Sequence, residues 1–468
     1  MQSAAGTAGT ADDEPLADVL HRVQLPELWT ELDRPLAAVL SSLTRGARWR
    51  LAIARELLRE PALLCIDEPT AALARHERRA KPSGLAFAIA DRVDALNPAH
   101  WDALAANASF FASRDYRRVL ESHAPDGMGA RYAIAYRGDE PIVAVAAQVL
   151  DVRGDQVANL DGSKMRKRAL AQVSSRLLVC GSLVSSGFHG LAFAPGVDEA
   201  LCWHAVAEAL YRIRRADRLS GQVDYVMVKD LDETRGAAAQ ALRDFSYRPM
   251  ETEPEMAMPV RPHWKKFDDY LADLTSDYRS KVRKVAKQVE QAGYRVERNA
   301  DAAPHDARLH ELYCEVEGRA ATRLAALPRG YFGALATVAG RERFRCTLIR
   351  NDDHVAGFMT TVKDGNRALG YYVGLDYAVN AKVPLYLRLL ASLVEDAIEL
   401  GCDEVSFGRT AAEPKASLGA TPKASHVWIR HRLPVVNAVV RELFARVQPD
   451  EVPTRRPFKQ KAEGEPAT

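Results

Sequence analysis

Residues 345–407, which read RCTLIRNDDHVAGFMTTVKDGNRALGYYVGLDYAVNAKVPLYLRLLASLVEDAIELGCDEVSF, decide the fold of this chain. Strand-like patterns over 345–350, 355–363 and 367–374 are separated by Asn/Asp and Asp-Gly-Asn turns. Apolar residues then recur at helical spacing until a glycine ends the helix, and a short strand follows over 404–407. The stripe of this helix is Leu389, Leu390, Leu393, Ala397 and Leu400. The stretch predicts an antiparallel meander, a helix and one more strand.

The same order of elements occurs once before. Residues 131–137 and 141–152 predict a hairpin, and 176–186 predict a further strand. A helix over 201–215 and a strand over 224–230 follow, and the helix has an apolar face made of Cys202, Val206, Leu210 and Ile213. The two helices begin at 201 and 385, which is a domain-sized separation. The chain therefore predicts a duplicated α+β domain.

The segment between the two copies, 267–297, combines an apolar stripe with basic residues on its other faces. The basic residues are Arg279, Lys281, Arg283, Lys284 and Lys287. Composition shifts and Pro/Gly breaks then suggest a division of the chain. We expect a disordered lead-in (1–15), a truncated ATPase-like segment (16–80), a first domain (85–260), a basic helical segment (261–300), a second domain (301–448) and a flexible tail (449–468).

Bulk composition narrows the function classes. The 468 residues include 64 Lys and Arg against 62 Asp and Glu, and a net charge of +2 argues against a general nucleic-acid coat. Charged residues interrupt every apolar run, so we expect no membrane span, and the N-terminus lacks the pattern of a secretory signal. The six cysteines form no CxxC pair, which favours buried free thiols over a zinc site. A cytoplasmic location is expected.

Residues 43–74, LTRGARWRLAIARELLREPALLCIDEPTAALA, resemble the signature-to-Walker-B stretch of ABC ATPases. The resemblance implies that Asp67 matches the magnesium-holding carboxylate and Glu68 the residue that polarises the attacking water. Phosphate binding also needs a Gly-rich loop with a Lys, and the 42 preceding residues contain none. Arg45 occupies the position of a signature glycine. We expect a remnant without ATPase activity of its own, which is either a fusion relic or half of a site that a separate ABC-type subunit completes.

Two further stretches carry a second resemblance, which covers about residues 85–445. They are WKKFDDYLADLTSDYRSKVRKVAKQVEQAGY (264–294) and YYVGLDYAVNAKVPLYLRLLASLVEDAIELGCDEVSFGRTAAEPKASLGA (371–420). Both resemble the GNAT-like and Fem-type N-acyltransferases, in which two acetyltransferase folds lie side by side. The resemblance implies an α+β fold of two tandem GNAT-like domains. It also implies transfer of an acyl or aminoacyl group to an amine of a small molecule or peptide, with no tightly bound cofactor and no metal.

Candidate site residues follow from the same stretches. Tyr372 and Asp376 leave the third predicted strand toward the site, and Glu404 begins the short strand over 404–407. All three are candidates for proton transfer, with core packing as the alternative for Tyr372 and an exposed carboxylate as the alternative for Glu404. Arg409 and Lys415 lie past a strand end and suit a phosphate or carboxylate of the donor, with a surface ion pair as the alternative. Two residues of the basic helix suit an RNA backbone, or form a solvated face: Lys281 and Arg283.

The donor is open between acyl-CoA and aminoacyl-tRNA as co-substrate. GNAT enzymes hold the CoA pyrophosphate on a Gly-rich loop at a helix N-terminus. Here 375–386 has no glycine and 191–202 has only Gly196, which counts against CoA. Two hypotheses remain. The chain is an N-acyltransferase, or it is a non-catalytic adaptor whose ATPase-like segment pairs with a partner subunit.

Overall fold

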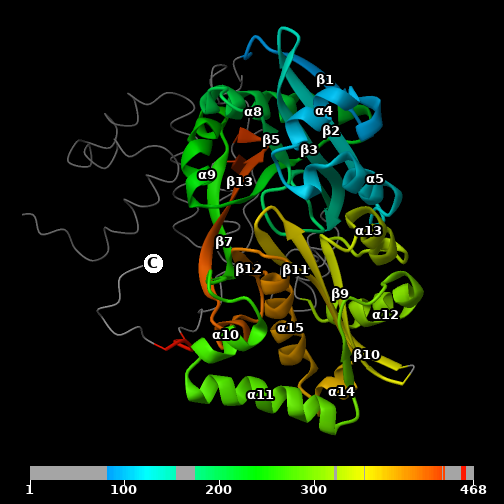
Figure 1. The fold of residues 1–468 in the computed structure, drawn as a ribbon. Helices are drawn as coiled ribbons and strands as arrows, with labels where there is room; N and C mark the ends of the chain where they lie inside the picture. Colours follow the sequence, from blue (N-terminus) through cyan, green and yellow to red (C-terminus); the bar gives the residue numbers. More distant parts are fainter. Residues whose placement is uncertain are drawn as a thin grey trace, which may run out of the picture.

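The computed structural model describes residues 82–153, 174–320, 324–352, 354–434, 436–437 and 455–459. These residues form one mixed sheet of 13 strands with helices on both faces (Figure 1). The first half contributes β1 (Ala86–Ala90), β2 (Gly129–Arg137), β3 (Glu140–Arg153), β4 (Ser174–Cys180), β5 (Leu191–Phe193), β6 (Tyr225–Leu231) and β7 (Arg248–Pro259). The second half contributes β8 (Arg295–Glu297), β9 (Phe344–Asn351), β10 (His354–Asp364), β11 (Arg367–Leu375), β12 (Glu404–Ser406) and β13 (Thr421–His431).

The helices connect these strands in the same way in both halves. The first half has α4 (Pro98–Ala105), α5 (Arg114–Ser122), α8 (Glu199–Ala216) and α9 (Glu233–Ala238). Two helices bridge to the second half, α10 (Phe267–Asp273) and α11 (Ser276–Gln291). The second half has α12 (Asp306–Glu317), α13 (Tyr331–Ala339), α14 (Tyr377–Asn380), α15 (Leu385–Glu399) and α16 (Ala412–Ala416).

Each half contains a meander followed by a β-α-β unit with parallel strands. In the first half α8 connects β4 to β6, and in the second half α15 connects β11 to β12. The helix α8 packs on β2, β3 and β4, while α15 packs on β9, β10 and β11. Every apolar residue predicted on these two helices is buried. The duplicated α+β arrangement predicted from the sequence is confirmed.

The last strand of each half pairs with the other half. The spatial order is β4-β6-β13-β7-β12-β11, so β13 is antiparallel to β6 and β7 is antiparallel to β12. These two strands also pair with each other along their length, and they run through the middle of the molecule in Figure 1. This exchange fuses the two halves into one sheet.

Two predicted elements have different bounds in the structure. The strand predicted over 176–186 ends at Cys180, because Gly181 adopts a φ of +129° that interrupts the ladder. The helical segment predicted over 267–297 divides at Leu274 and Thr275 into α10 and α11 and ends in β8.

Four cysteines are buried free thiols, as predicted: Cys180, Cys202, Cys346 and Cys402. Cys314 is also free but is exposed, and Cys65 lies outside the described residues. Within the described ranges, no helix has the length and apolar character needed to span a bilayer.

Candidate functional site

A cavity of about 670 Å³ lies between the two halves. The first half lines it with residues from 186–193, the end of β6 and the start of α9. The second half contributes the β10–β11 turn at 364–367, the start of β12, Arg409 and part of β13. Charged side chains from both halves face this space, so the cavity suits a polar ligand rather than an apolar one.

Two neighbouring side chains of β6 form hydrogen bonds with the backbone of the loop that follows β4. The Lys229 ammonium donates to the carbonyl oxygens of Ser182 (2.7 Å) and Ser185 (2.9 Å). The Asp230 carboxylate accepts from the Gly187 amide at 3.0 Å. Three successive points of the loop backbone are therefore fixed by one strand.

Side chains of two further elements hold the same loop. On β3, the Gln148 amide oxygen accepts from the Leu183 amide at 2.7 Å. On α5, the buried Arg117 guanidinium donates to the His189 carbonyl. Support from several directions preorganises the loop, because no single contact has to hold its geometry alone.

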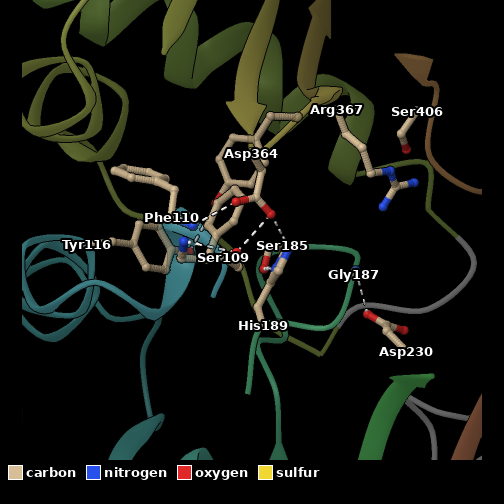
Figure 2. A network of polar contacts seen from close by, with 12 residues as sticks. Ser109, Phe110, Tyr116, Ser185, Gly187, His189, Asp230, Asp364, Arg367 and Ser406 are labelled. Carbon is tan, nitrogen blue, oxygen red and sulfur yellow. Dashed lines mark hydrogen bonds and ion pairs between the residues drawn. The ribbon is translucent and has the colours of Figure 1, made fainter. Parts of the chain in front are cut away.

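His189 lies on the cavity wall and is almost fully buried. Its Nδ1 lies 2.8 Å from Ser185 Oγ, and its Nε2 lies 3.5 Å from Asp364 Oδ2. Figure 2 shows His189 between these two side chains. The ring stacks on Phe111 with 4.2 Å between centroids. A Cβ at Gly187 would stand 2.7 Å from Nε2, so the ring requires glycine at that position.

Asp364 comes from the second half and anchors to the first. Its carboxylate accepts from Ser109 Oγ at 2.8 Å and from the Phe110 amide at 2.7 Å (Figure 2). Burial raises the pKa of this carboxyl, but the contact with His189 and the two hydrogen bonds outweigh it and hold the pKa below its ordinary value. Burial lowers the pKa of His189, although Asp364 opposes this. At neutral pH the pair is therefore a neutral imidazole beside a carboxylate.

A first charged cluster of the cavity wall is centred on Arg409. Arg409 pairs with Asp230 and donates to Ser425 Oγ (2.9 Å), while Lys415 donates to the Arg409 carbonyl. Lys415 is 3% exposed, and burial lowers its pKa to about 7.

A second charged cluster lies on the cavity wall at the start of β11. It places the Arg367 guanidinium between two carboxylates, at 2.7 Å from Glu255 and 2.8 Å from Glu404. The two acidic side chains come from β7 and β12, so this cluster also joins the two halves.

The structure brings three of the predicted site residues together. Glu404 and Arg409 line the cavity, and Lys415 lies directly behind Arg409. Tyr372 does not line it, but its hydroxyl donates to the Val184 carbonyl at 3.0 Å and so supports the loop that carries His189.

The other predicted residues lie elsewhere. Asp376 follows the opposite end of β11, where it caps α14 and accepts from the Val379 amide at 3.1 Å. Lys281 and Arg283 are on α11, which packs against α15 and does not line the cavity. Asp67 and Glu68 lie outside the described residues.

Sequence reasoning missed Ser185, His189 and Asp364. The sequence predicts Asp364 only as a turn residue and places Ser185 inside the strand predicted over 176–186, while His189 follows that strand in the run SSGFHG. The available signal was that run itself, because small residues around a histidine after a strand are typical of loops that carry function.

A GNAT enzyme would hold pyrophosphate at the N-termini of α8 and α15. Here residues of the protein itself fill both positions. At α8 the Asp198 carboxylate caps the helix by accepting from the Leu201 amide at 3.0 Å, and Glu199 adds a second negative charge. At α15 the N-cap is Pro384, which has no N–H, and the Asn380 side chain accepts from the Tyr386 amide at 3.1 Å. A pyrophosphate at either position would meet a carboxylate or an occupied amide.

Comparisons with known proteins identify two regions. Residues 276–416 match the family model of the acetyltransferase (GNAT) domain, and residues 2–71 match that of the ABC transporter. The ATP-dependent lipid A-core flippase of Bordetella avium (strain 197N) is 31% identical over 138 residues, which cover 28% of this chain and 23% of that protein. The chain thus spans about a quarter of the curated relative that it matches.

Solved structures with low sequence identity are also similar. FemX has a TM-score of 0.45 at 13% identity, over 75% of this chain and 98% of FemX. A tandem GNAT protein from the clavulanic acid biosynthesis pathway has a TM-score of 0.42 at 16% identity, over 74% of this chain and 98% of that one. L-PGS from Bacillus licheniformis has a TM-score of 0.42 at 12% identity, over 71% and 96% of the two chains.

Proposed function

We propose that this chain, which carries a GNAT-type acetyltransferase domain over 276–416 and an ABC-transporter fragment over 2–71, is an N-acyltransferase. It moves an acyl or aminoacyl group from an activated donor to an amine in the cavity between its two halves. The observation that carries this proposal is His189, buried on the cavity wall with Asp364 behind it. Burial lowers the pKa of its imidazole, which favours the neutral form.

The reaction requires a group that accepts a proton. An amine that attacks an ester or thioester carbonyl must lose a proton as the amide forms, and a neutral imidazole takes protons near pH 7. The ionised Asp364 favours the tautomer with a proton on Nε2, which leaves Nδ1 as the acceptor. Asp364 then stabilises the imidazolium that results. Glu404 and Arg409, which line the same cavity, are proposed to orient the substrates.

The donor contact is proposed for Arg409. Its guanidinium lines the cavity, and Lys415 holds its backbone in place from below. A planar guanidinium suits a phosphate or carboxylate of the donor. Aminoacyl-tRNA is the donor that needs no pyrophosphate site at α8 or α15, and Lys281 and Arg283 are proposed to contact its backbone.

Coenzyme A is expected not to bind at α8 or α15. The Asp198 carboxylate caps the N-terminus of α8. At the N-terminus of α15, Pro384 has no N–H and the Tyr386 amide is already bonded to Asn380. Calorimetric titration of the full chain with CoA and with acetyl-CoA should therefore give no saturable heat at concentrations up to about 1 mM, a typical upper KM. A micromolar Kd that is lost on deletion of the 3′-phosphoadenosine diphosphate part would contradict this expectation.

A donor–acceptor matrix tests the function itself. Acyl-CoA and aminoacyl-tRNA donors are incubated with amino acids and small peptides, and amide products are detected by mass spectrometry. The proposal requires an amide product that depends on the protein.

The second candidate, a non-catalytic adaptor, is favoured by the ABC-transporter match. It would be selected by a tightly held ABC-type subunit in co-purification together with no amide from any donor.

A further inference from the structure

Three side chains next to the cavity stand in the order of nucleophile, base and orienting acid. The Ser185 hydroxyl lies 2.8 Å from His189 Nδ1, and His189 Nε2 lies 3.5 Å from the Asp364 carboxylate. This order activates a serine in enzymes of several unrelated folds. We infer that Ser185 is a covalent nucleophile, so that the acyl group passes through an acyl-serine ester before it reaches the amine. This inference rests on the proposed function.

The direction of the hydrogen bonds follows from the charge of Asp364. Its carboxylate is ionised because Ser109 Oγ and the Phe110 amide both donate to it. A carboxylate can only accept, so the imidazole presents N–H from Nε2. The lone pair of Nδ1 is then directed at Ser185, whose hydroxyl must be the donor. In this tautomer His189 is placed to take the serine proton.

Ser185 also has a fixed backbone and directly precedes two residues of the cavity wall. Lys229 holds its carbonyl oxygen at 2.9 Å, and the next two residues, Ser186 and Gly187, line the cavity. Ser185 itself is 9% exposed. A purely structural Ser–His hydrogen bond would not require a neutral histidine at a cavity wall, an ionised carboxylate behind it and a loop fixed by side chains of β3, β6, β11 and α5.

The covalent step balances without an oxidant or a reductant. Ser185 Oγ attacks the carbonyl carbon of an ester or thioester donor while its proton moves to His189 Nδ1. The bond from the carbonyl carbon to the leaving oxygen or sulfur breaks, and the leaving group takes the proton from the imidazolium. The amine then attacks the acyl-serine ester, His189 takes its proton, and the serine leaves with that proton. The proposed donor class is therefore an activated ester or thioester.

Labelling of the full chain with p-nitrophenyl acetate tests the inference. Intact-mass spectrometry should show one added acetyl group, mapped to Ser185 by peptide fragmentation. The Ser185→Ala variant should lose the label, and Ser185→Cys should regain it, because a thiol also attacks esters. Ser220→Ala, an exposed serine at the end of the helix region after α8, should label like wild type. Asp364→Asn should slow labelling roughly a hundredfold or more through the wrong tautomer.

The outcomes separate this inference from the proposed function. If wild type and Ser185→Ala form the amide product at equal rates and neither is acetylated, Ser185 is not a nucleophile and transfer is direct. If Ser185 is acetylated but no amine is ever consumed, Ser185 is a nucleophile, but its acyl ester does not lead to an amide and the N-acyltransferase proposal fails. A label on Ser182 or Ser186 in place of Ser185 would also overturn the inference. Matching thermal unfolding curves for Ser185→Ala and wild type exclude misfolding as the cause of lost labelling.

Discussion

Replacing His189 by glutamine is expected to lower the rate of acyl transfer by about 10²–10⁴-fold, the usual contribution of a positioned general base. Glutamine retains a similar length and polar atoms that reach Ser185, but it cannot take a proton near neutral pH. Steady-state rates in the donor–acceptor assay measure the effect. The loss should fall on kcat, because the side chain acts in the chemical step rather than in holding the ground-state substrate.

The pH dependence gives an independent readout of the same group. Burial lowers the pKa of His189 below its ordinary value of 6.5, so the base is neutral at pH 7. The rate should therefore fall only at a pH below 6.5. Asp364 opposes this shift and raises the pKa. The Asp364→Asn variant should therefore move the acid limb of the rate profile to lower pH while lowering the plateau. An acid limb that stays in place would show that His189 is not the group that titrates.

A control separates chemistry from general damage. His100 lies on α4 with its ring near Tyr136 and does not line the cavity. His100→Gln should keep the wild-type rate. A rate in His189→Gln within about threefold of wild type, with His100→Gln unchanged, would contradict the role of His189 as the base.

The elements that local periodicity encodes could be predicted from the sequence. The apolar stripe of α15 repeats every three or four residues, and the hairpins carry Gly and Asn turns, so both copies are recognisable without tertiary information. The parallel pairs β4–β6 and β11–β12 agree with the order meander, helix, strand, because a helix between two strands favours a parallel crossover.

The strand exchange could not be predicted because its cause is not local. β7 reads RPMETEPEMAMP, and its prolines and glutamates do not form an alternating apolar pattern. It is stabilised by two partners from the other half, β12 and β13, which lie more than 140 residues away in the chain. Tertiary context decides such strands more than propensity does.

The site divides in the same way. Glu404, Arg409 and Lys415 are accessible to sequence reasoning because one of them begins a short predicted strand and the other two follow it closely. His189 and Asp364 come from different halves and meet only because the β10–β11 turn contacts the loop after β4. Asp376 is a candidate from the sequence because it follows β11, but the cavity lies at the end where β11 begins. A strand prediction alone does not say which of its ends faces the ligand.

Gly190→Ala is expected to destabilise the protein by about 2–4 kcal/mol, the sum of overpacking and of lost backbone hydrogen bonds. A Cβ at this position would stand 2.4 Å from the Gly181 nitrogen and 2.7 Å from its Cα, which are backbone atoms that cannot rotate away. Gly190 and Gly181 also each form one backbone hydrogen bond with Ala146 of β3. The Ala146 amide donates to the Gly190 carbonyl at 2.7 Å, and the Ala146 carbonyl accepts from the Gly181 amide at 3.1 Å.

The clash at Gly190 should also displace His189, the proposed base. Separating Gly190 from Gly181 moves the chain immediately after His189, so activity should fall together with stability. Urea unfolding monitored by circular dichroism measures the stability. Gly236→Ala is the matched control: this glycine lies in α9, has no positive φ, and leaves open space within 4 Å of an added Cβ, so alanine should be neutral or stabilising by up to about 1 kcal/mol. Equal midpoints for Gly190→Ala and wild type would mean that the backbone at Gly181 yields. The close approach would then not be what fixes the loop, and the preorganisation on which His189 depends would lose its physical basis.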